Sequence, residues 1–177
     1  MPTKTIHSLA ELPHKTEMLR IGRPTSMLAD SIFLAGPVSE DADWQYEARD
    51  MLIGKGFDGT IFCPNIYSPE DSQKTKAVLS WNKKAMRMST AIMFWLPAEE
   101  NSMYFDTYFQ LGRYANSDQT VVGMPENAFN RREIAHYYAY EHAWKDTHKT
   151  LEETVKAAMA KAFKRTDTFR EIATVAV

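Results

Sequence analysis

The chain has 177 residues, of which 44% are apolar and 25% are charged, with a formal net charge of −2 and a pI of about 6.2. These values predict one soluble globular domain, large enough to bury a core, and they exclude the basic surplus of a nucleic-acid-binding protein. A single cysteine, Cys63, excludes an internal disulfide and predicts a reducing, cytoplasmic setting. Because the chain has no long apolar run, we expect no membrane span and no signal peptide.

The first part of the chain predicts an arm followed by a strand and a helix. Residues 1–30 contain four helix- or strand-breaking residues, and they predict an irregular arm with one short helix and one short strand. The apolar residues 31–37, which end in Gly-Pro, predict a buried parallel strand. A helix is expected over residues 44–55, with Asp43 as its N-cap and Gly56 as its stop.

The rest of the chain continues this alternation. Strands are expected over residues 60–64, 91–96 and 120–125, and helices over 75–88, from Phe105 onward, over 131–145 and over 150–163. Thr150 and Glu153 have the spacing of a capping box at the start of the last helix. The tail after Arg165 has no clear assignment. The predicted organisation is therefore an arm (1–30), an α/β domain (31–165) and a C-terminal tail (166–177).

Strands that alternate with helices predict an α/β fold with a doubly wound parallel sheet flanked by helices. Such sheets bind ligands beyond the carboxyl ends of their strands. In this sequence those ends are residues 36–37, 63–65, 97–106 and 124–125. Polar loops at these ends are the expected place for a site.

The segment from Phe105 to Tyr114 is the strongest candidate site, because it follows a strand and a polar loop and opens a helix on polar side chains. Asp106 and Gln110 are four residues apart and share a helix face. A carboxylate at position 110 would indicate a nucleophile, whereas an amide is a poor one. Asp106 has a second interpretation, at least as strong, as a charge favoured by the helix N-terminus.

Other chemical motifs are weaker. The three histidines His136, His142 and His148 are six residues apart, a spacing that does not predict a metal site. Cys63 lies in an apolar run, which favours an inert buried thiol. The chain has no glycine-rich dinucleotide or phosphate loop and no nucleophile elbow, so no cofactor is expected.

Glycine and aromatic residues near the strand ends have two interpretations each. Gly36, followed by Pro37, is either a plain strand exit or a point where a ligand approaches the backbone. The aromatic side chains either stack a planar base or fill the core; they are Trp44, Trp81, Trp95 and Tyr104.

Several of these segments, in this order and spacing, resemble the nucleoside 2-deoxyribosyltransferase-like family, in particular a branch often carried by phages and bacteria. The segments are residues 32–37, Trp81, residues 91–97, residues 105–114, residues 121–125 and residues 150–155. The resemblance covers roughly residues 31–160.

The resemblance implies a Rossmann-like or flavodoxin-like fold, a homo-oligomer, and cleavage of the N-glycosidic bond of a nucleoside or nucleotide. In the family a glutamate attacks the anomeric carbon, the base leaves, and another base or water takes the glycosyl group. A second carboxylate assists the departing base. The glutamate position falls on Gln110, in Gln110-Leu111-Gly112, and the assisting carboxylate falls near Asn82. Gly36 and Pro37 are expected to shape the sugar or base pocket.

Two amides at the expected carboxylate positions leave three interpretations open. The chain binds a nucleotide-like ligand without turning it over, or it uses a displaced carboxylate, for which Asp106 is the candidate, or Gln110 is an introduced substitution that traps a ligand. The expected function is therefore a deoxyribosyltransferase or N-glycoside hydrolase, and the alternative is a catalytically silent nucleotide-binding protein that sequesters or senses its ligand.

Overall fold

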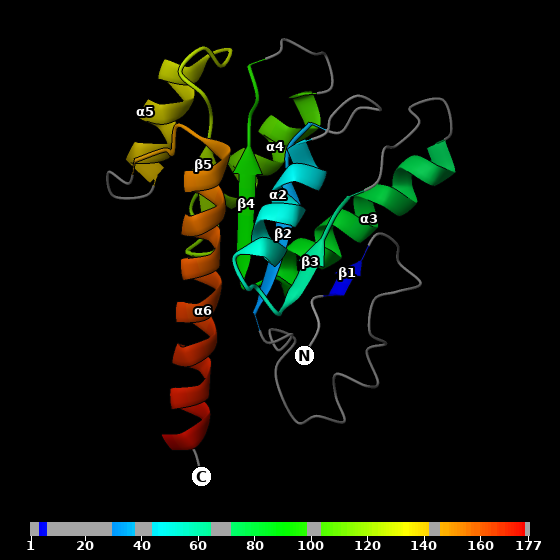
Figure 1. The fold of residues 1–177 in the computed structure, drawn as a ribbon. Helices are drawn as coiled ribbons and strands as arrows, with labels where there is room; N and C mark the ends of the chain where they lie inside the picture. Colours follow the sequence, from blue (N-terminus) through cyan, green and yellow to red (C-terminus); the bar gives the residue numbers. More distant parts are fainter. Residues whose placement is uncertain are drawn as a thin grey trace.

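The computed structural model describes residues 4–6, 30–37, 44–64, 72–98, 104–141 and 146–175, and these residues form a parallel sheet covered by helices (Figure 1). The strands, in sheet order, are β1 (Lys4–Ile6), β3 (Thr60–Phe62), β2 (Ser31–Ala35), β4 (Ala91–Trp95) and β5 (Thr120–Gly123). The helices are α2 (Trp44–Gly54), α3 (Ser72–Met88), α4 (Tyr104–Tyr114), α5 (Arg131–Glu141) and α6 (Leu151–Val175). The predicted α/β class, with a parallel, doubly wound sheet, is confirmed.

The two central strands explain why apolar runs predicted this sheet. β2 and β4 pair in parallel from Ile32↔Ala91 to Ala35↔Phe94. All ten residues of the two strands are buried. Because both faces of such strands are covered, their sequences are continuously apolar instead of alternating.

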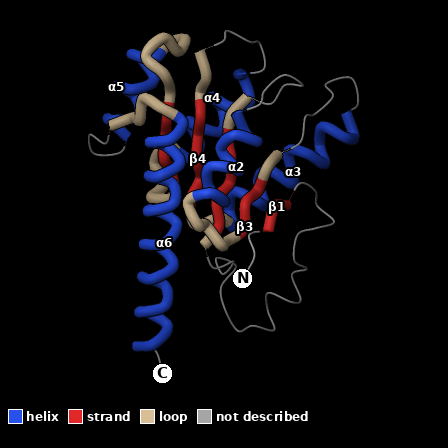
Figure 2. Tube along the Cα trace, viewed as in Figure 1, coloured by secondary structure: helices blue, strands red, loops and turns tan. Residues whose placement is uncertain are grey.

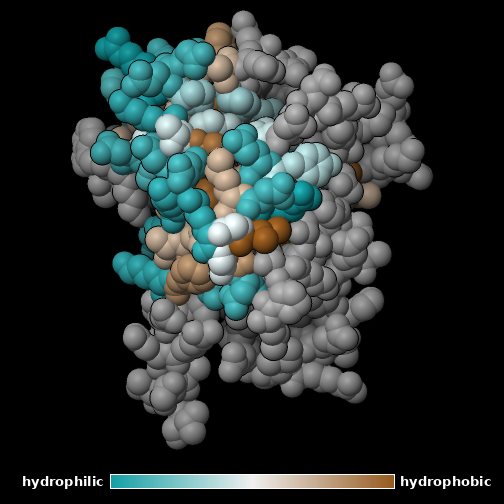
Figure 3. Space-filling view, viewed as in Figure 1, coloured by the Kyte–Doolittle hydropathy of each residue, from teal (hydrophilic) through white to brown (hydrophobic). Residues whose placement is uncertain are grey.

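Alternate residues of β2 enter different cores, since successive side chains of a strand point to opposite faces. Phe33 packs in a core with residues of α3, α4 and α5. Leu34 packs in a second core with residues of α2 and α6. The helices therefore cover both faces of the sheet (Figure 2). The face that carries α2 and α6 is mainly hydrophilic on its described surface (Figure 3).

Helix α2 ends where the sequence predicted a stop. Gly56 has a φ of 81°, a left-handed conformation that glycine adopts without strain. The Phe57 N–H donates to the Leu52 carbonyl at 3.0 Å and the Gly56 N–H donates to the Ile53 carbonyl at 2.9 Å. This pair of bonds is the Schellman motif, which satisfies the last carbonyls of a helix. The expected N-cap, Asp43, lies outside the described residues.

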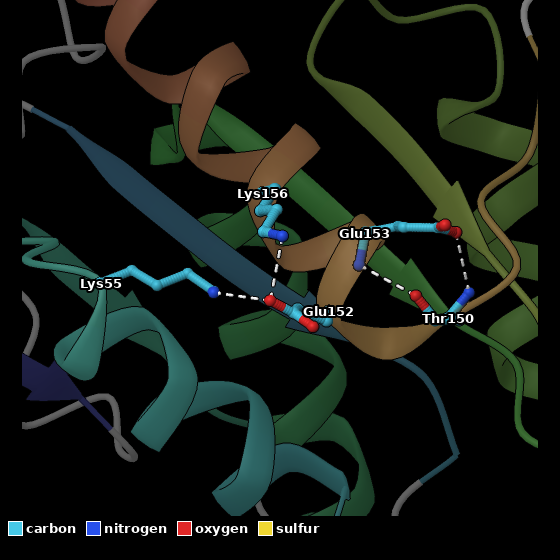
Figure 4. A network of polar contacts seen from close by, with 5 residues as sticks. All are labelled: Lys55, Thr150, Glu152, Glu153 and Lys156. Carbon is cyan, nitrogen blue, oxygen red and sulfur yellow. Dashed lines mark hydrogen bonds and ion pairs between the residues drawn. The ribbon is translucent and has the colours of Figure 1, made fainter.

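Helix α6 begins with the predicted capping box (Figure 4). The Thr150 hydroxyl accepts from the Glu153 N–H at 3.1 Å, and the Glu153 carboxylate accepts from the N–H groups of Thr150 and Lys149. These bonds hold the pKa of Glu153 below its usual value. Glu152 points the other way, toward Lys156 and toward Lys55, the residue after α2, and the hydrogen bonds from both lysines lower its pKa to about 2.

Replacement of Thr150 by alanine is expected to lower the free energy of unfolding by about 1 kcal/mol, because it removes the N-cap acceptor. For a chain of this size the melting temperature should fall by roughly 2–4 °C. Circular dichroism melts of the two proteins would measure the shift. Ser80→Ala, an exposed change within α3, is the control and should cause no loss. Equal melting temperatures for Thr150→Ala and the parent chain would contradict the prediction.

The structure corrects several element boundaries. The last helix does not end at Phe163 but continues to Val175, through the tail that had no assignment. No glycine or proline follows Pro125 in the sequence, so nothing in the chain stops this helix. Helix α3 begins at Ser72, three residues before the expected start. Helix α5 ends at Glu141, and residues 142–145 lie outside the described residues.

The expected arm contributes to the sheet. Residues Lys4–Ile6 pair in parallel with β3, from Lys4↔Thr60 to Ile6↔Phe62, and form its edge strand. The predicted short helix of the arm lies outside the described residues. The division of the chain at residues 30 and 165 stays a prediction.

Candidate functional site

The sheet reverses its winding between β2 and β4. The chain leaves β2 for α2, which packs in the core that contains Leu34, and it leaves β4 for α4, which packs in the opposite core through Leu111. β2 and β4 are neighbours in the sheet. Connections that leave neighbouring strands on opposite sides define the topological switch point, where open α/β sheets bind ligands. Residues 38–43, 65–71 and 99–103, which follow β2, β3 and β4 in the sequence, lie outside the described residues.

Gly36 sits at this switch point and packs tightly against protein atoms. A Cβ at position 36 would lie 2.5 Å from the carbonyl oxygen of Trp95 and 2.5 Å from Cζ2 of Trp44. The glycine is therefore required for the approach of β2, β4 and α2. This packing explains the residue without a ligand, and its role in ligand binding stays a prediction.

Pro37 and Trp44 fasten the strand exit to the first residue of α2. The indole N–H of Trp44 donates to the Pro37 carbonyl at 2.9 Å. Both residues are buried, and Trp44 is 7% exposed. The indole donor is already used, and little of the ring surface is left for a base. The predicted stacking role of Trp44 has no support in this geometry and stays untested.

Helix α3 carries two orphaned polar atoms side by side in the sequence. The Trp81 ring contacts Phe33 and Phe62, with ring centroids 5.8 and 6.4 Å away, and among the described residues its buried indole N–H has no acceptor. The neighbouring Asn82 is half-buried, and its buried Oδ1 has no donor in the same part of the chain. An unsatisfied buried group costs about 1–3 kcal/mol. Such a cost is commonly tolerated where a ligand supplies the missing partner.

Helix α4 presents the expected site residues on one flank. Thr107 and Leu111 face the core and are buried. Asp106, in the first helical turn, and Gln110, one turn later, are both half-buried and lie beside that buried stripe. The helix begins at Tyr104, whose side chain is not described. Asp106 and Gln110 thus lie at the border between core and solvent, where a side chain can reach a ligand.

The structure places Asn82 and the pair on α4 over the same face of the sheet. Their helices α3 and α4 contribute to one core, which also contains Phe33 and Phe94. No hydrogen bond or ion pair joins Asn82 to Asp106 or Gln110 within the described part of the chain. The three side chains therefore belong to helices on one face of the sheet, and no hydrogen bond links Asn82 to the other two.

The structure also bears on two other candidates from the sequence, the Cys63 thiol and a metal site. Cys63, directly after β3, is buried as expected, and burial raises the pKa of its thiol to about 12, against a smaller lowering by Arg49. A thiol with so high a pKa is a poor nucleophile. Among the described residues, no three histidine, cysteine, aspartate or glutamate side chains are grouped so that they could hold a metal ion.

Sequence reasoning missed a cavity of about 610 Å³ beside β5. Its charged lining comes from the start of α5, the segment 146–149 and the start of α6. The start of α5 is separated in sequence from the continuous stretch 146–153, so only the fold brings these two parts of the lining together.

These features define a doubly wound α/β protein, a class in which ligands bind at the switch point of the sheet. The sequence profile of the "Nucleoside 2-deoxyribosyltransferase like" family matches residues 29–128, and the chain belongs to this family. The matched segment contains β2, β4 and α4, with Asn82, Asp106 and Gln110.

A solved structure of a 2-deoxyribosyltransferase from the psychrotolerant bacterium Bacillus psychrosaccharolyticus has a similar fold. The TM-score is 0.53 at 11% sequence identity, over 75% of this chain and 95% of that chain. At this identity the likeness concerns the fold alone. The curated proteins contain no match to this sequence.

Proposed function

We propose that the protein binds a nucleoside or nucleotide at the β2–β4 switch point and acts on its N-glycosidic bond, as a deoxyribosyltransferase or an N-glycoside hydrolase. Membership of the family supports the substrate class. The observation that carries the proposal is the orphaned Oδ1 of Asn82, on the same face of the sheet as Asp106 and Gln110. An acceptor without a donor fits a hydroxyl or N–H of a sugar or base.

The chemistry requires a carboxylate at the anomeric carbon, because the transition state resembles an oxocarbenium ion. The Gln110 amide carries no full charge, so in this proposal the Asp106 carboxylate, one turn earlier on the same flank, attacks or stabilises that carbon. Gln110 and Asn82 hold the sugar or base by hydrogen bonds. No cofactor is part of this scheme, and Gly36, Pro37, Trp81 and Tyr104 would border the ligand.

Incubation of the protein with deoxynucleosides and deoxynucleoside monophosphates, followed by chromatography for free base, tests the proposal. Base release with water alone indicates a hydrolase, and release that requires an acceptor base indicates a transferase. Tight binding measured by calorimetry, with no release, supports the alternative of a silent nucleotide-binding protein. Absence of both binding and release would overturn the proposal.

The silent alternative has its own observation, namely that both expected carboxylate positions hold amides, Gln110 and Asn82. It predicts that the double variant Gln110→Glu with Asn82→Asp releases base where the parent chain does not. Each single variant serves as the matched control and should release less, since catalysis by a pair of groups is non-additive. No release from the double variant, on any of the substrates, would remove the support for placing the family's carboxylates at these positions.

Assembly and location remain predictions within this proposal. A homo-oligomer is expected from the family resemblance, and the exposed Phe105 and Phe109 of α4, 75% and 70% accessible, are the side chains expected to be covered. A cytoplasmic setting is expected from the single cysteine. No described helix is both long and apolar enough to cross a membrane.

A further inference from the structure

The cavity of about 610 Å³ lies beside the carboxyl end of β5, outside the residues that the family profile matches. His148, on its wall, runs alongside β5: its N–H donates to the Val122 carbonyl and its carbonyl accepts from the Met124 N–H, each at 2.9 Å. The next residues are fixed by the capping box of α6. The cavity wall is therefore built on a rigid frame.

Arg131 is a cation that lines this cavity, and its charge also acts on the nearby Glu126 carboxylate, whose pKa is lowered mainly by Lys149 and to a smaller extent by Arg131. It is the first residue of α5, half-buried, and no carboxylate of the described chain forms an ion pair with it. Its Nε is buried and meets no acceptor. A guanidinium whose Nε–H has no acceptor among the described residues retains that donor for an oxyanion contact. The N-terminal end of the α5 dipole adds positive potential at the same point, although the N–H groups of Arg131 and Ile134 donate to the carbonyls of Ala128 and Asn130.

The other charged groups that line the cavity are already engaged or open to solvent. The Glu153 carboxylate accepts two backbone N–H groups at the start of α6. The Lys149 ammonium pairs with Glu126 at 2.8 Å, but both side chains are mostly exposed, so this pair is weak and can be exchanged for a ligand. Asp146 is exposed, and salt screens its charge.

We propose that this cavity binds a phosphate group, with the Arg131 guanidinium as the main contact and with Lys149 and His148 as further donors. A phosphate supplies the acceptors that Arg131 lacks, and Arg contacts such oxyanions through paired N–H groups. The cavity has the volume of a small-molecule site, so it accommodates either free phosphate or the phosphate of a larger molecule. This site does not depend on the proposed glycosidic chemistry.

Titration calorimetry of the full chain with inorganic phosphate, at constant low ionic strength, tests the proposal. Arg131→Gln should weaken binding at least about tenfold, the loss expected for a hydrogen bond to a charged group. Arg132→Gln is the matched control, because it removes the same charge from the next, exposed residue, which does not line the cavity. The phosphate affinity of Arg132→Gln should stay within about twofold of that of the parent chain. Arg131→Lys keeps the charge but not the paired N–H groups of arginine, so its affinity should lie between those of Arg131→Gln and Arg132→Gln.

Absence of phosphate binding by the parent chain, or equal losses in Arg131→Gln and Arg132→Gln, would overturn the proposal. Thermal melts show whether each variant is folded, and Arg131→Lys keeps the test valid if Arg131→Gln is not. The same titrations with a deoxynucleoside 5′-monophosphate and its nucleoside identify the source of the phosphate. If Arg131→Gln weakens the binding of the monophosphate but not of the nucleoside, the site holds the phosphate of a nucleotide. If it weakens the binding of inorganic phosphate alone, the site holds a separate anion. Both readouts are binding, so an inactive protein leaves them intact.

Discussion

Replacement of Asp106 by asparagine is expected to lower the rate of base release by about 10²–10⁴-fold, the range for the loss of a group that acts in the transition state. Asp106 is the described carboxylate on the same α4 flank as Gln110, the position where the family resemblance places the nucleophile. Asparagine keeps the shape of the side chain but removes the charge that an oxocarbenium-like centre requires. The loss should therefore appear in kcat, with KM changed much less.

Asp50→Asn is the matched control for this prediction. Asp50 is exposed on α2, and its ion pair with Arg49 lies at the surface, so the substitution should leave the rate within about twofold. Full activity in Asp106→Asn would exclude the displaced-carboxylate interpretation. The next candidates would then be the acidic residues among 38–43, which follow β2 in the sequence and lie outside the described residues.

Local rules predicted the parts of the fold whose causes are local. The apolar runs of β2 and β4 are short, continuous and bounded by breakers, and both strands formed within two residues of the expected limits. The stop at Gly56 and the capping box at Thr150 depend on a few neighbouring residues, and both were confirmed. The continuation of α6 to Val175 was missed, because the sequence after Arg165 contains no terminator and only a weak apolar pattern.

The site was predicted less completely, because it depends on contacts between residues that are far apart in the sequence. Sequence spacing placed Asp106 and Gln110 on one helix face, and the structure has both half-buried on α4. The orphaned acceptor of Asn82 depends on which atoms of the fold surround it, so no motif announces it. Gly36 could be interpreted as a ligand contact or a strand exit, and only the positions of Trp95 and Trp44 show which atoms fill the space above it.

Replacement of Gly36 by alanine is expected to lower the free energy of unfolding by about 2–3 kcal/mol, the upper part of the range for an overpacked position. The added Cβ would lie 2.5 Å from the Trp95 carbonyl oxygen, an atom fixed in the sheet, and 2.5 Å from the Trp44 ring. This clash can be relieved only if β2 and β4 separate at the switch point. Nucleoside affinity should therefore fall together with stability. Urea unfolding and ligand titration measure the two effects.

Gly112→Ala is the control, because a Cβ at that position of α4 meets no atom within 4 Å. In a helix interior this change should stabilise the protein by about 0.5–1 kcal/mol. The double variant Gly36→Ala with Trp44→Leu separates the two sources of strain, since it clears the side-chain contact and leaves the backbone one. We expect the double variant to have a lower free energy of unfolding than Trp44→Leu alone. If the double variant is no less stable than Trp44→Leu, the Trp95 carbonyl does not limit this position, and the close approach of β2 to β4 is not what requires glycine there.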